Sequence, residues 1–203
     1  RGLRNSMALA VHPASNSVLQ GENGIDLKDE DRPYEEINFV EKGKYYGWPY
    51  CHSDGQVSPF FKDKIDAADC LKKYTQPVVF MPAHVAPLGL LFYSGEKLST
   101  LNNKLLVSWH GYKDAGHRIV AYPIDNRGVP SSNQYSQVVY GWDAKAGIRP
   151  MGAPTGLLQL NDGSILILDD KNAAVLRLST GTASDIESDN RNAKAPAVSE
   201  AMI

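Results

Sequence analysis

Residues 155–178 read TGLLQLNDGSILILDDKNAAVLRL, and this stretch decides the fold class. Three apolar runs, Leu157–Leu160, Ile165–Leu168 and Val175–Leu178, are separated by short polar segments that contain Asp162-Gly163 and Asp169-Asp170. Short apolar runs bounded by Asn, Asp and Gly are typical of β-strands joined by tight turns. We therefore predict three consecutive strands in this stretch.

Strand-sized apolar runs of the same kind recur through most of the chain, and no long amphipathic helical pattern accompanies them. The other runs are Met7–Val11, Ser17–Gln20, Glu36–Val40, Gly89–Tyr93, Lys104–Trp109, Arg118–Tyr122 and Tyr135–Tyr140. The sequence therefore predicts an all-β protein.

The unit of residues 155–178 repeats over Leu88–Tyr122 and, less regularly, over Ala8–Val40. Repeated sheets that cannot bury their own faces alone are typical of a β-propeller built from four-stranded blades. About three blades fit within residues 1–179, whereas a closed propeller needs about four to eight. We expect residues 180–203, which are rich in Ser, Ala, Asp and Asn, to form a flexible tail or linker.

The composition excludes several classes of partner. The 21 basic and 23 acidic residues nearly balance, so no field of one sign indicates nucleic acid. No apolar stretch reaches the length of about 20 residues that a membrane-spanning helix requires. The nucleophile elbow of α/β-hydrolases, the phosphate-binding loop and the zinc-protease helix motif are also missing from the sequence.

Cys51 and Cys70 are the two cysteines of the chain, and their spacing matches neither a zinc ribbon nor a c-type haem site. A loop-like stretch with Asp54-Gly55 and Pro59 separates them. They form either one disulfide, which would indicate an oxidising compartment, or two buried free thiols.

An oxygen-rich segment, Gly21–Lys28, precedes the acidic residues Asp29–Asp31 and Glu35-Glu36. Calcium takes six to eight oxygen ligands, including backbone carbonyls, and glycine allows a carbonyl to turn toward the ion. Runs of charge are more commonly solvated. The segment is therefore either an exposed acidic loop or a cation site.

Four aromatic residues surround Gly47 and Pro49 in the run Tyr45–Tyr50. Such a run either fills a gap in the core or provides flat faces for a sugar or a planar cofactor.

Three further clusters carry candidate ligand or proton-transfer groups. They are His84 between Pro82 and Pro87, the stretch His110–Lys113 with His117-Arg118, and Arg149 before Gly152. Strand ends are where propellers place binding groups, but solvated turns have the same composition. A fixed arginine can also hold a carboxylate through two parallel hydrogen bonds.

Together these clusters resemble, in order along residues 1–179, the glucose/sorbosone dehydrogenases that use pyrroloquinoline quinone (PQQ). The most specific segments are Gly2-Leu3-Arg4-Asn5 and Tyr46-Gly47-Trp48-Pro49; the Glu22-Asn23-Gly24 loop, His84–Phe92 and Arg149–Gly152 add to the resemblance. The resemblance implies a six-bladed propeller, of which this chain is about the C-terminal half. It also implies a sugar or related alcohol or aldehyde as substrate, an external electron acceptor, and a periplasmic or secreted location.

The resemblance implies roles for particular residues. Arg4 would lie close to the quinone carboxylates and Asn5 near the quinone oxygens, with His110, Lys113 and Arg149 as further cofactor-binding residues. Backbone carbonyls of Gly24 and Ile25 would contact the catalytic Ca²⁺. Glu36 and the Tyr46 carbonyl are similar to residues that hold a second, structural calcium in some members.

The general-base histidine of the family lies upstream of the arginine-asparagine motif, so we expect it before Arg1, and His84 does not match its position. The missing N-terminal blades would therefore be the partner that completes the site. Two alternatives remain open. One is a non-catalytic, calcium-stabilised propeller that binds carbohydrate or protein; the other is a calcium-dependent propeller lactonase, against which the arginines argue.

Overall fold

The computed structural model describes residues 1–142 and 150–181 of the chain, and in this part the fold is all-β as predicted. The first sheet has the order β1-β2-β3-β6. Its strands are β1 (Asn5–Val11), β2 (Val18–Asn23), β3 (Glu35–Val40) and β6 (Val79–Met81).

The second sheet also has four antiparallel strands, and the third has three. The second contains β7 (Pro87–Tyr93), β8 (Lys104–Trp109), β9 (Arg118–Pro123) and β10 (Ser136–Val139). The third is the meander predicted from residues 155–178: β11 (Pro154–Gln159), β12 (Ile165–Asp169) and β13 (Ala174–Leu178). These three sheets are three successive blades, as the repeat predicted.

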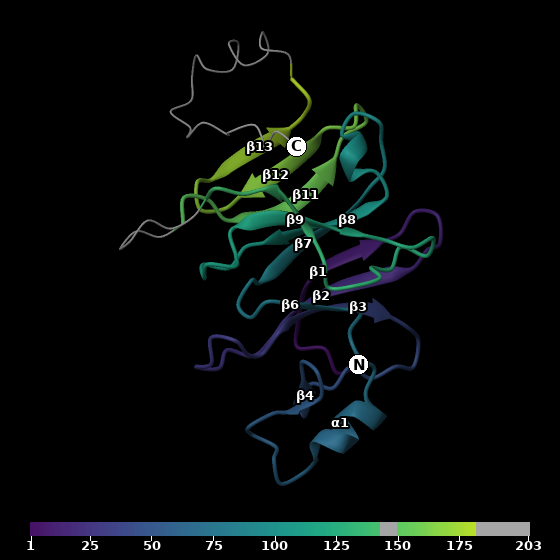
Figure 1. Cartoon of the computed structure of the whole chain (residues 1–203), viewed down its shortest axis with the longest axis vertical. Helices are drawn as coiled ribbons and strands as arrows, with labels where there is room; N and C mark the ends of the chain where they lie inside the picture. Colours follow the sequence, from purple (N-terminus) through teal and green to yellow (C-terminus); the bar gives the residue numbers. More distant parts are fainter. Residues whose placement is uncertain (143–149, 182–203) are drawn as a thin grey trace.

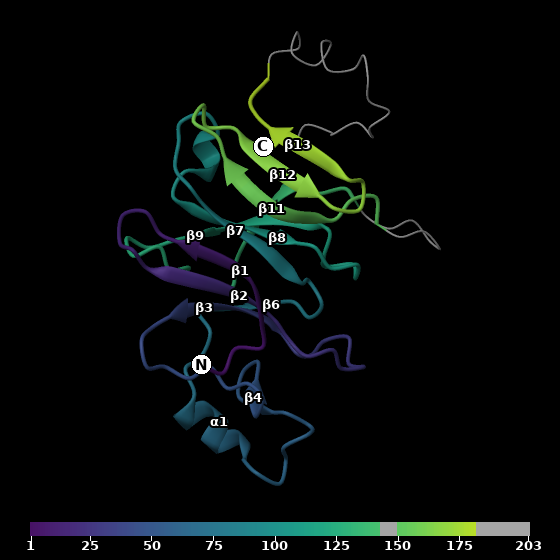
Figure 2. The same cartoon turned by 180° about the vertical axis from the view of Figure 1, so that it is seen from behind.

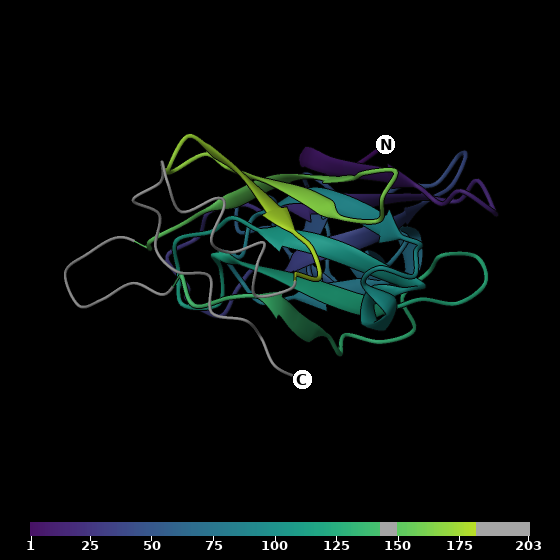
Figure 3. The same ribbon diagram turned by 90° about the horizontal axis from the view of Figure 1, so that it is seen from above.

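Figure 1 shows the three sheets following one another along the long axis of the molecule. The first strands of the blades, β1, β7 and β11, lie side by side, as Figures 2 and 3 show from other directions. Side chains alternate along β8, so Leu105 and Val107 pack toward the first sheet while Leu106 packs toward the third. Each interface between neighbouring sheets therefore has its own apolar core.

A disulfide-bonded excursion, residues 41–78, leaves the first sheet between β3 and β6. It contains β4 (Cys51–His52), β5 (Gln56–Val57) and the helix α1 (Ala67–Lys73), whose first turn is capped by the Asp66 side chain. Cys51 and Cys70 are joined by a disulfide, which decides between the two alternatives left by the sequence. The helix was not predicted, because the stretch between the cysteines has the composition of a loop.

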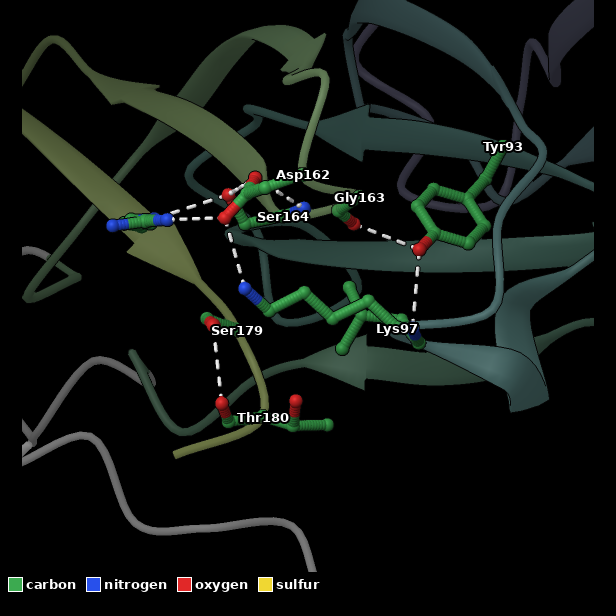
Figure 4. A network of polar contacts seen from close by, with 9 residues as sticks. Tyr93, Lys97, Asp162, Gly163, Ser164, Ser179 and Thr180 are labelled. Atoms are coloured by element: carbon green, nitrogen blue, oxygen red, sulfur yellow. Dashed lines mark hydrogen bonds and ion pairs between the residues drawn. The ribbon is translucent and has the colours of Figure 1, made fainter. Parts of the chain in front are cut away.

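Away from the candidate site, a polar network links the second and third blades (Figure 4). Asp162 accepts hydrogen bonds from Lys97, Ser164 and Arg177, and these contacts hold its pKa below its usual range. The Tyr93 hydroxyl donates to the Gly163 carbonyl at 2.7 Å. The turn between β11 and β12 is thus fixed against the second blade.

No helix in the described part of the chain is long and apolar enough to cross a membrane.

Both outer faces of the three-blade stack expose large apolar side chains. Met7, Leu9 and Val11 alternate along β1 on one face, and Leu158, Leu168 and Val175 lie on the other.

We expect the 203-residue chain, produced alone, to self-associate through these faces. Size-exclusion chromatography with light scattering should show more monomer when Met7, Leu9 and Val11 are changed to Thr. Phe60→Ser, on the excursion, should have no such effect, and a monodisperse monomer of the unaltered chain would contradict the prediction.

Candidate functional site

Six connecting segments gather at one end of the three blades, at the left in Figure 1. Antiparallel pairing places the start of each first strand, the end of each second strand and the start of each third strand at the same edge. The segments are residues 1–4, 24–34, 82–86, 110–117, 150–153 and 170–173. The candidates in or directly beside these segments are Arg4, Asn5, Gly24, Ile25, His84, His110 and Lys113. Arg149 lies outside the described residues, and Glu36 and Tyr46 lie elsewhere.

A buried carboxylate fixes the backbone of the arginine-asparagine motif. Glu22 accepts hydrogen bonds from the backbone N–H groups of Arg4 and Asn5, at 2.5 and 2.8 Å, and from the Ser6 hydroxyl at 3.1 Å. The Gln20 amide donates to its second oxygen at 2.7 Å. The β1–β2 ladder is irregular between Asn5 and Ala8, so the carboxylate supplies the acceptors that the irregular ladder lacks.

The Arg4 side chain lies over the glycine loop. Its Nη1 donates to the carbonyls of Asn23 and Gly24 at 3.2 and 2.7 Å, and its guanidinium carbon is 5.6 Å from the centre of the Trp48 ring. The structure therefore brings together the two most specific segments of the sequence, residues 2–5 and 46–49. Within the described residues only Nη1 of the guanidinium is hydrogen-bonded, so its other N–H groups can donate to an anion.

A second buried carboxylate holds the loop from behind. Glu35 accepts a hydrogen bond from the Gly24 N–H and another from the Ala86 N–H, so it joins the loops before β3 and β7. Burial raises the pKa of Glu35 to about 7, against the opposing effect of these hydrogen bonds. Glu35 thus fixes the peptide group before Gly24 through the Gly24 N–H, and Arg4 fixes the peptide group after it through the Gly24 carbonyl.

An oxygen beside this loop is suited to a cation. The Asn23 side chain is buried, and among the described residues its Oδ1 has no hydrogen-bond partner. An unpartnered buried oxygen next to the Gly24 carbonyl is the kind of hard donor that Ca²⁺ prefers. Asn23 therefore fits a calcium at this loop, while the Gly24 carbonyl accepts from Arg4 in this structure, and the calcium roles expected for Gly24 and Ile25 remain predictions. No three His, Cys, Asp or Glu side chains converge to hold a metal within residues 1–142 and 150–181.

Glu36 and Tyr46 line one small cavity of about 10 Å³ between the first sheet and the excursion. The Glu36 carboxylate accepts hydrogen bonds from the Ser53 N–H at 2.9 Å and from the Asn38 amide at 3.3 Å. Burial raises its pKa to about 8. A cavity of this size holds about one water molecule or ion. The two residues expected to share a structural calcium are therefore neighbours.

The aromatic run has a structural and a site-facing part. The Tyr46 hydroxyl donates to the Phe39 carbonyl at 2.7 Å and accepts from the Glu41 N–H at 2.8 Å, which ties the run to the end of β3. Trp48 instead faces Arg4.

The histidines and the lysine connect loops of different blades. His110 Nε2 lies 3.1 Å from both carboxylate oxygens of Asp170, and His84 Nε2 lies 2.9 Å from the Asp29 carbonyl. Lys113 Nζ is 2.8 Å from Glu30, at the rim between the first and second blades. A side chain on Gly111 would collide with the His84 carbonyl, so glycine is required there. The cofactor roles expected for His110, Lys113 and Arg149 remain predictions.

The sequence reasoning favoured a solvated loop for the acidic run, and this interpretation is wrong for Glu22, Glu35 and Glu36, which are all buried. Their importance as acceptors of backbone N–H groups was missed. A signal was available, because all three are adjacent to residues that continue the strand pattern of β2 and β3.

Comparison with known proteins points to one family. The family model for glucose/sorbosone dehydrogenases matches residues 1–178. An uncharacterized protein of Borreliella burgdorferi is 32% identical over 183 residues, which are 87% of this chain and 47% of that protein. A pyrroloquinoline quinone-dependent sugar dehydrogenase of Hypocrea jecorina is 26% identical over 161 residues, 64% of this chain and 35% of the relative.

The fold is also that of solved relatives. A calcium structure of a Trichoderma reesei carbohydrate-active enzyme of family AA12 superposes with a TM-score of 0.73 at 21% identity, covering 87% of this chain and 52% of that one. The chain thus spans about a third to a half of the length of these relatives. From the family match over residues 1–178, the chain belongs to the glucose/sorbosone dehydrogenase family.

Proposed function

We propose that the chain is the C-terminal part of a PQQ- and calcium-dependent dehydrogenase of a sugar or related alcohol or aldehyde. The observation that carries the proposal is the convergence of Arg4, the Gly24 loop and Trp48 at the end of the first blade. Arg4 and Asn5 would hold the quinone, and the carbonyls of Gly24 and Ile25 would hold the catalytic calcium. Once bound, a calcium-polarised quinone supplies the hydride acceptor for oxidation of a hydroxyl carbon.

In this proposal the residues of this chain bind the quinone and the calcium and orient them. The remaining N–H groups of Arg4 are suited to a carboxylate, while Glu22 fixes the backbone from which Arg4 and Asn5 project. Glu35 directs the Gly24 peptide. Removal of the hydroxyl proton is assigned to a histidine outside this chain, as the family resemblance implies. A structural calcium at Glu36 and Tyr46 would tie the excursion to the first sheet.

The disulfide supports a periplasmic or secreted location, because such bonds persist in oxidising compartments. The partners would then be a small sugar and an external electron acceptor in the same compartment.

Absorption spectroscopy of the intact protein with added quinone and Ca²⁺ tests the proposal. We expect quinone absorbance that an aldose bleaches. Arg4→Ala should weaken quinone binding by about 10- to 100-fold, the effect of losing charge-assisted hydrogen bonds. Arg127→Ala is the matched control, since Arg127 pairs with Asp125 in the turn after β9, away from these loops. An intact protein that binds calcium but never quinone would instead favour a non-catalytic propeller that binds carbohydrate or protein.

A further inference from the structure

An open groove of about 1130 Å³ lies between the first and second blades, and segments 24–34, 82–86 and 110–117 contribute to its lining, whereas Arg4 and Gly24 do not. Three aromatic side chains and four carboxylates line it: Tyr34, Phe80 and Tyr135, with Glu30, Asp31, Asp54 and Asp114. Of the expected cofactor residues within the described ranges, Lys113 alone reaches its rim, where it pairs with Glu30. The Arg32 guanidinium, which stacks on Tyr34, pairs with Asp54.

Two buried donors lie directly behind the groove. The Trp109 and Tyr122 rings lie 4.7 and 5.9 Å from the Tyr135 ring, centre to centre. Both side chains are fully buried, and in residues 1–142 and 150–181 neither Trp109 Nε1 nor the Tyr122 hydroxyl finds a hydrogen-bond partner. Burial also raises the pKa of Tyr122, so its hydroxyl keeps its proton. Two unpartnered buried donors whose rings both pack on Tyr135 are unusual and costly in a folded protein.

Tyr135 separates these donors from the groove. It lies just before β10, and 40% of its surface is exposed. An aromatic face accepts a hydrogen bond only weakly, so the contact does not replace a full acceptor. A rotation of this exposed side chain would open the groove onto Trp109 and Tyr122.

We propose that this groove binds a neutral saccharide at a site separate from the Arg4 loop. Hydroxyl groups both donate and accept, so a sugar can donate to Asp31 and Asp114 at the mouth and accept from Trp109 and Tyr122 inside. Its apolar ring faces can stack on Phe80 and Tyr135. A simple cation could bind the carboxylates but could not accept from the two donors. An anion could accept from the two donors but could not donate to the carboxylates. The volume accommodates a sugar of at least two rings.

Calorimetric titration of the intact protein with cellobiose, in the absence of quinone and Ca²⁺, tests the site. Tyr122→Phe removes one donor and keeps the ring. It should weaken cellobiose binding by about 3- to 10-fold, the effect of one hydrogen bond, without lowering the melting temperature. Weaker binding without a lower melting temperature is expected, because the Tyr122 hydroxyl has no hydrogen-bond partner within the described residues when the groove is empty.

Tyr93→Phe is the matched control, because the Tyr93 hydroxyl donates to Gly163 at the other interface between blades (Figure 4). It should lower the melting temperature and leave cellobiose affinity unchanged. Spermidine and sulfate serve as a cationic and an anionic probe. The proposal is overturned if cellobiose gives no binding heat, if Tyr122→Phe binds it with unchanged affinity, or if either ion binds the groove in its place. Because quinone is absent, these outcomes do not depend on the proposed dehydrogenase activity.

Discussion

Glu22→Gln is expected to lower the free energy of unfolding by about 3 kcal/mol. The carboxylate accepts four hydrogen bonds from Arg4, Asn5, Ser6 and Gln20 and is almost fully buried. An amide keeps one accepting oxygen but places an NH₂ group against the two donors on the other side, so two of these buried or part-buried donors lose their acceptor. Urea titration of the intact protein measures the loss.

Glu41→Gln is the matched control, because Glu41 is exposed at the end of β3 and should tolerate the change within about 0.5 kcal/mol. The same substitution at Glu22 should also weaken quinone binding, since it loosens the backbone of Arg4 and Asn5. If Glu22→Gln leaves both the stability and the quinone affinity unchanged, the carboxylate does not anchor the motif.

Much of the fold could be predicted, because most strands of the second and third blades are short apolar runs bounded by turn residues. Residues 155–178 form the predicted meander with the turn at Asp162-Gly163. Strand β6 was missed, because its three residues pair with β3 across the whole excursion, a non-local contact that no short pattern encodes. The helix α1 was missed because its seven residues, which include Cys70, are too few to show a helical periodicity.

The candidate site could be predicted as a set of segments but not as a geometry. The register that pairs Asn5 with Asn23 brings Arg4 to the Gly24 carbonyl, and the order of motifs already indicated this end of the blade. The strand pattern of β2 and β3 could have indicated that Glu22, Glu35 and Glu36 are buried, but not which groups they accept from, because those backbone N–H groups are left free by an irregular ladder and by loops. The same limit applies to the groove at Tyr135, which joins residues from five separated segments.

In calcium-free protein, stability should fall as the pH rises from about 5 to about 8. Burial raises the pKa of Glu36 to about 8, whereas an unfolded glutamate has a pKa of 4.5. The folded state therefore binds more protons than the unfolded state in this window, and raising the pH favours unfolding. The contribution of Glu36 is fully present below about pH 4.5 and is lost by about pH 8, on the order of 4 kcal/mol. Glu35, with its pKa raised to about 7, acts in the same direction.

Calcium at the Glu36–Tyr46 cavity should oppose this loss, because a bound cation stabilises the ionised carboxylate. Urea unfolding at pH 5 and pH 8, with a chelator and with Ca²⁺, should show the larger calcium effect at pH 8. Glu36→Gln should reduce the pH dependence to the part that Glu35 contributes and should remove the calcium effect, while Glu41→Gln retains both. An unchanged response in Glu36→Gln would place the stabilising cation elsewhere. If Ca²⁺ still promotes quinone binding in Glu36→Gln, the calcium at Gly24 and Ile25 acts independently of the one that stabilises the blade.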